Sequence, residues 1–389
     1  MASSNVRVLD LSREYLLLKP LLLEAMESVL SRQRFVLGEE VDRFEKAAAA
    51  MCGVQNAVGC ASGTDALWLA LAGAGIAAGG AVVTTPFSFF ASVSCILRAG
   101  ARPVLADIDP ETFNLSPTAV RNALDSPDSN VIRAILPVHL FGQTADWDAF
   151  TAIRNERANA SGELLLIEDA AQAFGARWDS RPAGSLGDAA GFSFYPTKNL
   201  SAGGDAGMVT TSHPEIAERI RMLRAHGMRV RYHHEEVGWN SRLDTLQAAI
   251  LLVKLRFIEE WNQQRRMLAD NYRRLFERAG LVDSGPYPKQ AVVLPKTLPR
   301  ATHVYHQYVI RVQRRDELRA FLENRGVGTE IYYPLPLHLQ PALRSLGYSA
   351  GSFPESERAA QEVLALPMYP QLMPEEQETV VAQIAAFMS

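Results

Sequence analysis

The sequence is poor in cysteine and lacks long apolar runs. Its 389 residues contain three cysteines, at positions 52, 60 and 95, without the paired spacing of a zinc site or a disulfide framework. The early apolar segment 16–26 is interrupted by Lys19, Pro20 and Glu24, so no stretch is long enough to span a bilayer. The N-terminus has no signal-peptide core. These absences predict a cytoplasmic protein without a membrane partner, although three buried structural thiols would give the same cysteine pattern.

Strong charge of either sign is also missing. The formal net charge is −4, which gives no general reason to bind nucleic acid. Hydrophobic residues make up 48% and charged residues 21% of the chain, as in ordinary soluble globular proteins. The length exceeds one typical core and therefore predicts two domains.

Lysine is scarce, and one lysine has unusual surroundings. The chain has six lysines, at 19, 46, 198, 254, 289 and 296, among 39 basic residues. Lys198 follows the aromatic run 192–195 and a proline, and the glycine-rich segment 201–207 comes next. A desolvated lysine amine is partly deprotonated at neutral pH and can attack a carbonyl to form a Schiff base, which arginine cannot do. An exposed loop lysine is the ordinary alternative.

Strand patterns alternate with helix patterns over the first 250 residues. Apolar and β-branched runs predict strands at 81–85, 102–107, 131–140 and 164–167, the last two being continuous enough for central strands. Helical spacing predicts helices at 64–71, 216–223 and 246–257, and an N-terminal helix with Pro20 in its first turn.

The pattern changes after about residue 280. Prolines cluster at 286–299, followed by a predicted strand at 308–312 and a helix at 316–325. The sequence therefore predicts a large α/β domain over residues 1–250. A connecting helix and a smaller α+β domain would occupy residues 251–389.

One motif match is rejected. Residues 73–78 fit the dinucleotide-binding pattern G-x-G-x-x-A, which must follow a strand and open a helix. Here the glycines follow the helical run 65–71 and precede a strand, so they indicate the end of a helix.

Four segments could build a site around Lys198. Residues 59–67 form a small hydroxyl-bearing turn that leads into a helix, where backbone N–H groups can hold a phosphate; a plain helix cap is the alternative. Glu168 and Asp169 end a buried strand, where open α/β sheets place ligands. A carboxylate there can keep a pyridine nitrogen protonated, and Gln172 could reach a phenolic oxygen of the same ring. A carboxylate pair capping a helix is the ordinary alternative.

The other two segments are aromatic or polar. Residues 85–90 place several aromatics at a strand end, where one face could stack on a flat cofactor, although core packing explains most such clusters. Residues 238–244 form a polar turn that opens a helix and carries Asn240 and Arg242.

Together these motifs resemble the fold-type I, pyridoxal-phosphate-dependent sugar aminotransferases of the DegT/StrS type. The resemblance covers essentially the whole chain, from 35–38 to 332–338 and 366–370. It is most specific at Glu168-Asp169-Ala170-Ala171-Gln172 and at 193–199. It implies a large α/β domain with a mixed, mostly parallel sheet, a homodimer with its active sites at the interface, and no metal.

The resemblance also implies roles for single residues. Lys198 would bind the cofactor covalently, Asp169 would pair with the pyridine nitrogen, and Gln172 would contact the ring hydroxyl. The remaining cofactor contacts would come from Phe89 on the ring face, from Gly63, Thr64 and Ser193 at the phosphate with Ser62 in the same turn, and from Asn240 of the second subunit. Substrate contacts would come from Phe35 and, across the interface, from Arg242, Tyr332 and Tyr333.

The implied reaction transfers an amino group from L-glutamate to a keto-sugar carried by a nucleoside diphosphate. The segment 204–207 and the segment 328–334 are similar to family members that act at C3 of the hexose, on a dTDP-linked 3-keto-6-deoxyhexose or a UDP-sugar. Amination at C4 and a non-catalytic ligand-sensing regulator remain alternatives. Dehydratases of this fold replace the lysine with histidine, and Lys198 argues against that chemistry.

Overall fold

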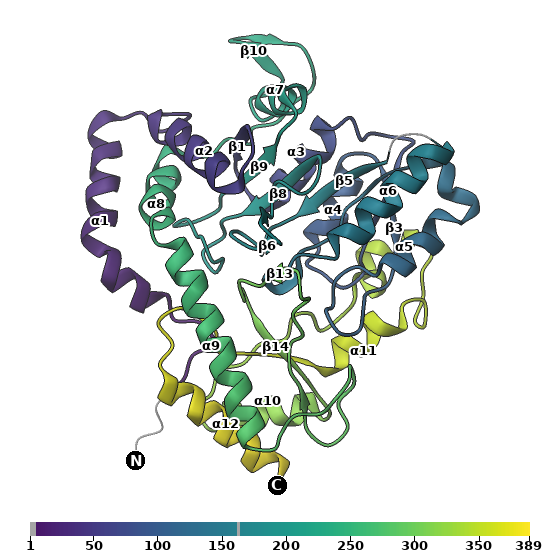
Figure 1. The fold of residues 1–389 in the computed structure, drawn as a ribbon. Helices are drawn as coiled ribbons and strands as arrows, with labels where there is room; N and C mark the ends of the chain where they lie inside the picture. Colours follow the sequence, from purple (N-terminus) through teal and green to yellow (C-terminus); the bar gives the residue numbers. More distant parts are fainter. Residues whose placement is uncertain (1–4, 162–163) are drawn as a thin grey trace.

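A seven-stranded sheet forms the centre of the larger half of the molecule (Figure 1). The computed structural model describes residues 5–161 and 164–389. The strands lie in the order β1-β9-β8-β5-β4-β2-β3. Their bounds are Asn56–Cys60 (β1), Gly207–Thr211 (β9), Ala189–Ser193 (β8), Leu165–Asp169 (β5), Ile132–Ile135 (β4), Ala81–Thr84 (β2) and Arg102–Leu105 (β3).

All neighbouring strands are parallel except where β9 is involved. β9 is antiparallel to both β1 and β8, whereas β8, β5, β4, β2 and β3 pair in parallel. The mixed, mostly parallel sheet is therefore confirmed. Such a sheet brings the carboxyl ends of its parallel strands to one edge, where ligands bind.

Helices cover both faces of this sheet. One face packs against α3 (Gly63–Gly73), α4 (Ala91–Arg98) and α7 (Pro214–Leu223). The other face contacts α5 (Pro117–Leu124) and α6 (Trp147–Ser161) at one end. At the opposite end it contacts α1 (Leu11–Arg32), α2 (Glu39–Cys52) and α8 (Thr245–Leu255). Alternate residues of each strand point to opposite faces, which explains the nearly continuous apolar runs.

The smaller half contains a three-stranded antiparallel sheet. Its strands are β12 (Val292–Val293), β14 (Tyr308–Val312) and β15 (Val363–Leu366), in that order. The helices α9 (Ile258–Arg278), α10 (Arg315–Glu323), α11 (Pro354–Glu362) and α12 (Pro374–Met388) belong to this half. Figure 1 shows α9 running from the larger half down to α12.

Short elements complete the chain. In one small sheet, β6 (Arg177–Trp178) pairs with both β13 (Ala301–Thr302) and β7 (Arg181–Pro182). In another, β10 (Met228–Val230) pairs with β11 (His233–His234). The β10–β11 hairpin projects from the larger half in Figure 1. Four 3-10 turns span Pro127–Val131, Leu140–Gly142, Leu337–Leu339 and Pro341–Leu346.

The first helix begins earlier than its proline predicts. Asp10 caps α1 by accepting a hydrogen bond from the Ser12 N–H at 3.0 Å, so Pro20 lies inside the helix instead of in its first turn. The prediction was wrong because a proline at the first helical position and a proline within a longer amphipathic helix leave the same apolar spacing downstream.

Two other boundaries differ from the sequence prediction. The helix predicted at 246–257 corresponds to α8, which ends two residues earlier at Leu255, and α9 begins after it at Ile258. Residue 250, where we expected the larger domain to end, lies inside α8. The predicted strand 131–140 is shorter, because β4 covers only Ile132–Ile135 and a 3-10 turn precedes it. Its central place between β2 and β5 is confirmed.

The predicted end of the helix at the glycines after residue 71 is confirmed. Helix α3 ends at Gly73, and the rejected dinucleotide motif follows it in a turn before β2. Cys52, Cys60 and Cys95 are buried and carry free thiols. Within residues 5–161 and 164–389, no helix is long and apolar enough to cross a membrane.

Candidate active site

The predicted site residues follow the carboxyl ends of β1, β5 and β8. Ser62 comes two residues after β1, Asp169 is the last residue of β5, and Ser193 is the last residue of β8. Lys198 lies five residues beyond Ser193, in a turn closed by a hydrogen bond from its N–H to the Tyr195 carbonyl at 2.8 Å.

The start of α3 is packed closely against the end of β8. Ser62 caps the helix by accepting a hydrogen bond from the Asp65 N–H at 3.1 Å. A Cβ atom on Gly63 would lie 2.5 Å from the Ser193 Cβ, and one on Gly207 would lie 2.2 Å from the Ser62 carbonyl oxygen. Both positions therefore require glycine. The first-turn N–H groups at Gly63 and Thr64 belong to a helix N-terminus, which favours a bound anion.

Asp169 is a buried carboxylate in a hydroxyl-rich setting. It is 3% exposed, and its Oδ2 accepts a hydrogen bond from the Ser92 hydroxyl at 2.7 Å. The Ser92 hydroxyl lies 2.8 Å from that of Ser88, and the Ala171 N–H donates to Asp169 Oδ1 at 3.2 Å. Burial raises the pKa of Asp169, while the Ser92 and Ala171 hydrogen bonds and the positive charge of Lys198 oppose that rise. A cation placed here would be stabilised.

Glu168 has a different environment although it precedes Asp169. Its carboxylate accepts hydrogen bonds from the N–H groups of Gly184, Leu186 and Gly187 at 2.7–2.9 Å. His139 Nε2 lies 3.0 Å from the same carboxylate, and the other ring nitrogen accepts from the Ala145 N–H at 3.1 Å. Since Nδ1 accepts, Nε2 carries the proton and donates. Glu168 thus holds the backbone of residues 184–187 and the His139 ring against the end of β5. Of the two adjacent carboxylates, Glu168 has a structural environment and Asp169 is the candidate for a role in the site.

The Lys198 amine is electrostatically coupled to Asp169. Burial lowers the pKa of Lys198 from 10.5 to about 8, and the negative charge of Asp169 opposes this change. The side chain is half-buried. An appreciable fraction of the amine is therefore unprotonated near neutral pH, as a nucleophile or general base requires.

Gln172, Tyr333 and Phe89 line an adjacent part of the site. Gln172 accepts from the Phe141 N–H at 2.6 Å and donates through Nε2 to the Tyr333 hydroxyl at 3.1 Å. The Phe89 ring lies 6.4 Å from that of Tyr333, and its side chain is 58% exposed. We expected Tyr333 to approach from a second subunit, but it joins Gln172 of its own chain. The prediction was wrong because the segment 331–333 packs on the core of its own smaller half. Tyr332 is also packed there, half-buried.

Phe35, Asn240 and Arg242 lie around the start of α8, and the intervening Ser241 connects this region to the start of α3 by donating to Asp65 Oδ2 at 2.6 Å. The Phe35 carbonyl accepts from the Thr245 N–H at 2.9 Å, and the Phe35 side chain is 43% exposed. Asn240 is exposed and forms a β-bridge with Ala225. In the part of the chain that the structure describes, no hydrogen bond or ion pair joins these three residues to Lys198. We call residues 35–37 and 228–242 the arm surface.

The sequence predictions missed Ser88 and Ser92, which hold Asp169. Their i, i+4 spacing could have suggested two hydroxyls on one side, but nothing in the sequence indicates that they face a strand 77 residues away. They also missed His139, whose role depends entirely on its contact with Glu168.

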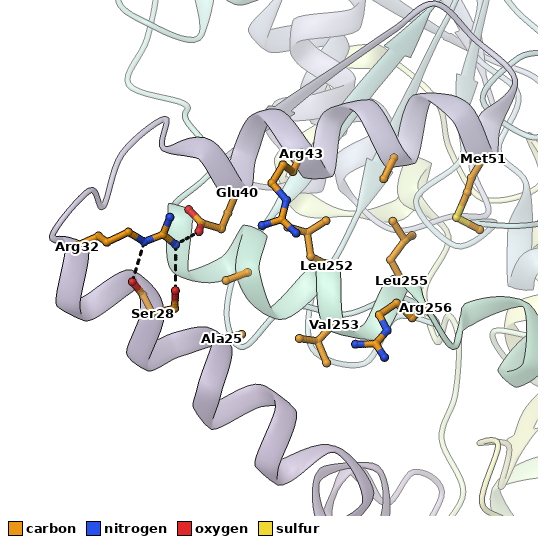
Figure 2. A pocket seen from close by; sticks show the side chains of 12 residues that line it. Ala25, Ser28, Arg32, Glu40, Arg43, Met51, Leu252, Val253, Leu255 and Arg256 are labelled. Carbon is orange, nitrogen blue, oxygen red and sulfur yellow. Dashed lines mark hydrogen bonds and ion pairs between the residues drawn. The ribbon is translucent and has the colours of Figure 1, made fainter.

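An open groove lies elsewhere, between α1, α2 and α8 (Figure 2). Its volume is about 610 Å³, and its lining combines apolar side chains with Arg32, Arg43 and Arg256. Arg32 bonds the Ser28 carbonyl and hydroxyl and pairs with Glu40. None of the predicted catalytic residues lines it. Among the described residues, no group of three or more His, Cys, Asp or Glu side chains is placed to hold a metal ion.

Comparison with known proteins identifies the family. The sequence profile of the DegT/DnrJ/EryC1/StrS aminotransferase family matches residues 18–385. The chain belongs to this family. It is 47% identical to a protein of Geobacillus stearothermophilus described as a pleiotropic regulatory protein, over 98% of each chain. It is 43% identical to the dTDP-3-amino-3,4,6-trideoxy-alpha-D-glucose transaminase of Streptomyces venezuelae, over 95% of this chain and 92% of that protein.

Solved structures agree with this assignment. The crystal structure of S. venezuelae DesV in complex with a ketimine intermediate superimposes with a TM-score of 0.92 at 40% identity, covering 99% of both chains. NtdA from Bacillus subtilis with bound cofactor PMP gives a TM-score of 0.84 at 29% identity, covering 95% of this chain and 81% of that one. The expected family and fold type are confirmed.

The residues present fit the pyridoxal phosphate of this family. Gly63 lets the start of α3 pack against Ser193, so that Ser193 lies beside the N–H groups of a helix N-terminus, which can bind a phosphate. Asp169 supplies a buried anion for a ring nitrogen. Lys198 supplies an amine whose pKa is lowered by burial and raised in part by the negative charge of Asp169.

Proposed function

We propose that this protein is a pyridoxal-phosphate-dependent aminotransferase that acts on a keto-sugar carried by a nucleoside diphosphate, with L-glutamate as amino donor. The observation that supports it most is the buried Asp169 carboxylate at the end of β5, on the same sheet edge as the Lys198 turn after β8 and the Gly63–Ser193 contact.

Each residue has one task in this proposal. The N-terminus of α3, with Ser62, Gly63, Thr64 and Ser193, binds the cofactor phosphate and so fixes one end of the ring. Phe89 stacks on the ring face. Asn240 of a second subunit completes the phosphate site.

Two side chains set the protonation of the ring. Asp169, held by Ser92, keeps the proton on the pyridine nitrogen, since burial makes an unpaired carboxylate costly and a cationic partner favourable. Gln172 would contact the ring hydroxyl through the amide group that donates to Tyr333.

Lys198 moves the proton. Bound pyridoxal phosphate supplies an aldehyde that accepts the amino group and a protonated ring that withdraws electrons. Lys198 would hold the cofactor aldehyde, and once the donor amine had displaced it, the Lys198 amine would act as the general base and acid that moves the donor's α-proton. With water as co-reactant, glutamate would leave as 2-oxoglutarate, and Lys198 would serve in the same way when the amino group passes to the sugar ketone.

The substrate proposed is a dTDP-linked 3-keto-6-deoxyhexose or a UDP-sugar aminated at C3. The segments 204–207 and 328–334 favour this position, and the similarity to a dTDP-3-amino-sugar transaminase agrees with it. Offering 3-keto and 4-keto sugar nucleotides together with glutamate, and locating the new amine by mass spectrometry and NMR, tests the proposal. Amination confined to C4 would refute the assignment of position. No product with any keto-sugar nucleotide would refute the activity.

The arm surface is proposed to complete the site of a second copy in a homodimer. Asn240 and Arg242 would reach the cofactor phosphate and the substrate of the partner, with Phe35 close by. Mixed dimers of Lys198→Ala and Asn240→Ala subunits test this. If Asn240 acts across the interface, one of the two sites in each mixed dimer is intact, so activity rises on mixing. If it acts within its own chain, mixing restores nothing.

A regulatory role is the second candidate, because one relative is described as a pleiotropic regulatory protein. A sensor would need a ligand-binding cleft but no reactive lysine beside a buried carboxylate. The purified protein with its cofactor is yellow if Lys198 is bonded to the cofactor aldehyde, and adding glutamate should bleach it. A colourless protein that stays unresponsive to added cofactor would favour the sensor. The cytoplasmic location remains a prediction from the sequence.

A further inference from the structure

The turn that carries Lys198 is tied to the smaller half of the molecule through the next residue, Asn199. The side chain of Asn199 is 6% exposed. Its Nδ2 donates to Asn262 Oδ1 at 2.8 Å and to the Val304 carbonyl at 3.0 Å. Asn262 belongs to α9 and Val304 to the segment before β14, so both partners come from outside the central sheet.

The orientation of both amides is fixed by backbone carbonyls, which can only accept. Asn262 Nδ2 donates to the Phe174 carbonyl at 3.0 Å, so its oxygen faces Asn199. Asn199 uses both amide hydrogens on Asn262 and Val304, so its oxygen is the acceptor that faces His306 Nδ1, 3.3 Å away. His306 must therefore carry its proton on Nδ1, which leaves Nε2 as a lone-pair acceptor in the neutral ring.

The ring of His306 is uncharged in this position. The side chain is 7% exposed, and burial lowers its pKa well below 6.5, helped by the positive charges of Lys198 and Arg265. The positive charge of Lys198 therefore disfavours protonation of the His306 ring. Arg265 holds the backbone of the same segment, donating to the carbonyls of Tyr305 and Met368, each at 3.0 Å.

Two glycines show how closely the chain is packed around this arrangement. A Cβ atom on Gly175 would lie 2.5 Å from Asn262 Nδ2, and one on Gly142 would lie 2.9 Å from the His306 backbone nitrogen. Both glycines have positive φ, +85° and +101°, which other residues rarely adopt. The hydrogen-bonded chain Phe174–Asn262–Asn199–His306 therefore has little room to shift.

We propose that Asn199 and His306 are positioning residues for Lys198. Asn199 clamps the lysine turn to α9 and to the segment before β14, and His306 holds the Asn199 amide in place by donating to its oxygen from Nδ1. A shift of about 1 Å in a reacting group can lower a rate about 100-fold, so a clamp on the neighbouring residue directly affects the reaction. The inference rests on the proposed role of Lys198 as the cofactor lysine.

The test compares two replacements of His306. Leucine removes the donor, whereas asparagine places an amide N–H where Nδ1 stands. The holoenzymes are compared by the pH titration of the bound-cofactor absorbance, which reports the protonation of its bond to Lys198, and by the rate of bleaching with glutamate. His306→Leu should move the titration midpoint by about half a unit or more and slow bleaching about 10-fold, with KM changed far less. His306→Asn should stay close to the wild type.

His338→Leu is the matched control. His338 is equally buried, and its Nε2 lies 2.9 Å from Glu357 Oε1, among the residues of another core cluster. Its loss should leave both the titration midpoint and the bleaching rate unchanged. If His306→Leu behaves like the wild type, or if leucine and asparagine at 306 have equal effects, the proposal is wrong.

A second pair of variants covers the case in which His306→Leu does not fold. Asn262→Ala removes one support of Asn199, while Asn271→Ala removes a comparable amide bond from the same helix, at 2.9 Å to Gln377. Asn262→Ala should slow bleaching about threefold or more, and Asn271→Ala should not. Equal behaviour of the two would overturn the proposal. A failure of Lys198→Ala to abolish cofactor attachment would instead refute the proposed function.

Discussion

The cofactor end of the site and the arm surface are built in opposite ways. Near Lys198, which is half-buried, the Asp169 and Gln172 side chains are buried and held by hydrogen bonds within one chain. On the arm surface, Phe35, Tyr232 and Val237 are 43%, 78% and 84% exposed. Under the proposed function, a single chain would supply the proton-transfer groups by itself. The exposed arm surface would be covered by another copy of the chain.

The largest effect is expected at the lysine itself. Lys198→Ala should lower turnover about 10⁴-fold, because it removes the covalent attachment and the proton carrier together. Lys198→Arg should be nearly as inactive, because its guanidinium stays charged. Product formation from a keto-sugar nucleotide, followed by mass spectrometry, measures both. Turnover near the wild-type rate in either variant would contradict the assignment.

The two adjacent carboxylates should separate activity from stability. Asp169→Asn should lower turnover about 10²–10³-fold by removing the charge at the ring nitrogen, with little loss of stability, since Ser92 can donate to the amide oxygen. Glu168→Gln should lower the free energy of unfolding by about 3 kcal/mol, because its NH2 group would face either the Gly184 N–H or the Leu186 and Gly187 N–H groups, which now donate to the carboxylate.

Urea unfolding and turnover measured on both variants distinguish these outcomes. Equal losses of activity and stability in the two variants would mean that Asp169 is as structural as Glu168.

The phosphate end is tested with two glycines of one helix. Gly63→Ala should weaken cofactor binding about 10–100-fold, because the new Cβ would lie 2.5 Å from Ser193 and open the start of α3. Gly73→Ala at the other end of α3 meets Ile220 at 2.6 Å and should cost stability without changing cofactor affinity. Absorbance titration of the cofactor-free proteins measures both affinities, and equal affinities would argue against a phosphate at α3.

The smallest effect is a pH dependence of the cofactor-free protein. Because burial lowers the pKa of Lys198 from 10.5 to about 8, the unfolded chain binds more protons between these values, and stability rises with pH across that window. Lys198→Met should therefore be more stable than the wild type by about 1–2 kcal/mol at pH 7, a figure reduced for partial exposure. The difference should vanish near pH 10.5. A difference independent of pH in urea titrations would contradict the lowered pKa.

The sequence predicted the buried half of the site better than the exposed half. Asp169 and Ser193 end strands and Gly63 begins a helix, and local sequence patterns are sufficient to predict such ends and starts. The wrong origin of Tyr333 and the unforeseen roles of Ser92 and His306 all depend on contacts between segments at least 77 residues apart. Such contacts have no local signature, because residue type alone does not show which distant segment a side chain faces.

Borohydride reduction of the yellow holoenzyme tests the central claim most directly. Reduction should make the attachment of the cofactor permanent, and peptide mapping should then find the label on Lys198 alone. Pre-treatment with glutamate, which releases the lysine, should prevent labelling. A label on another residue, or no label on a cofactor-loaded protein, would contradict the account.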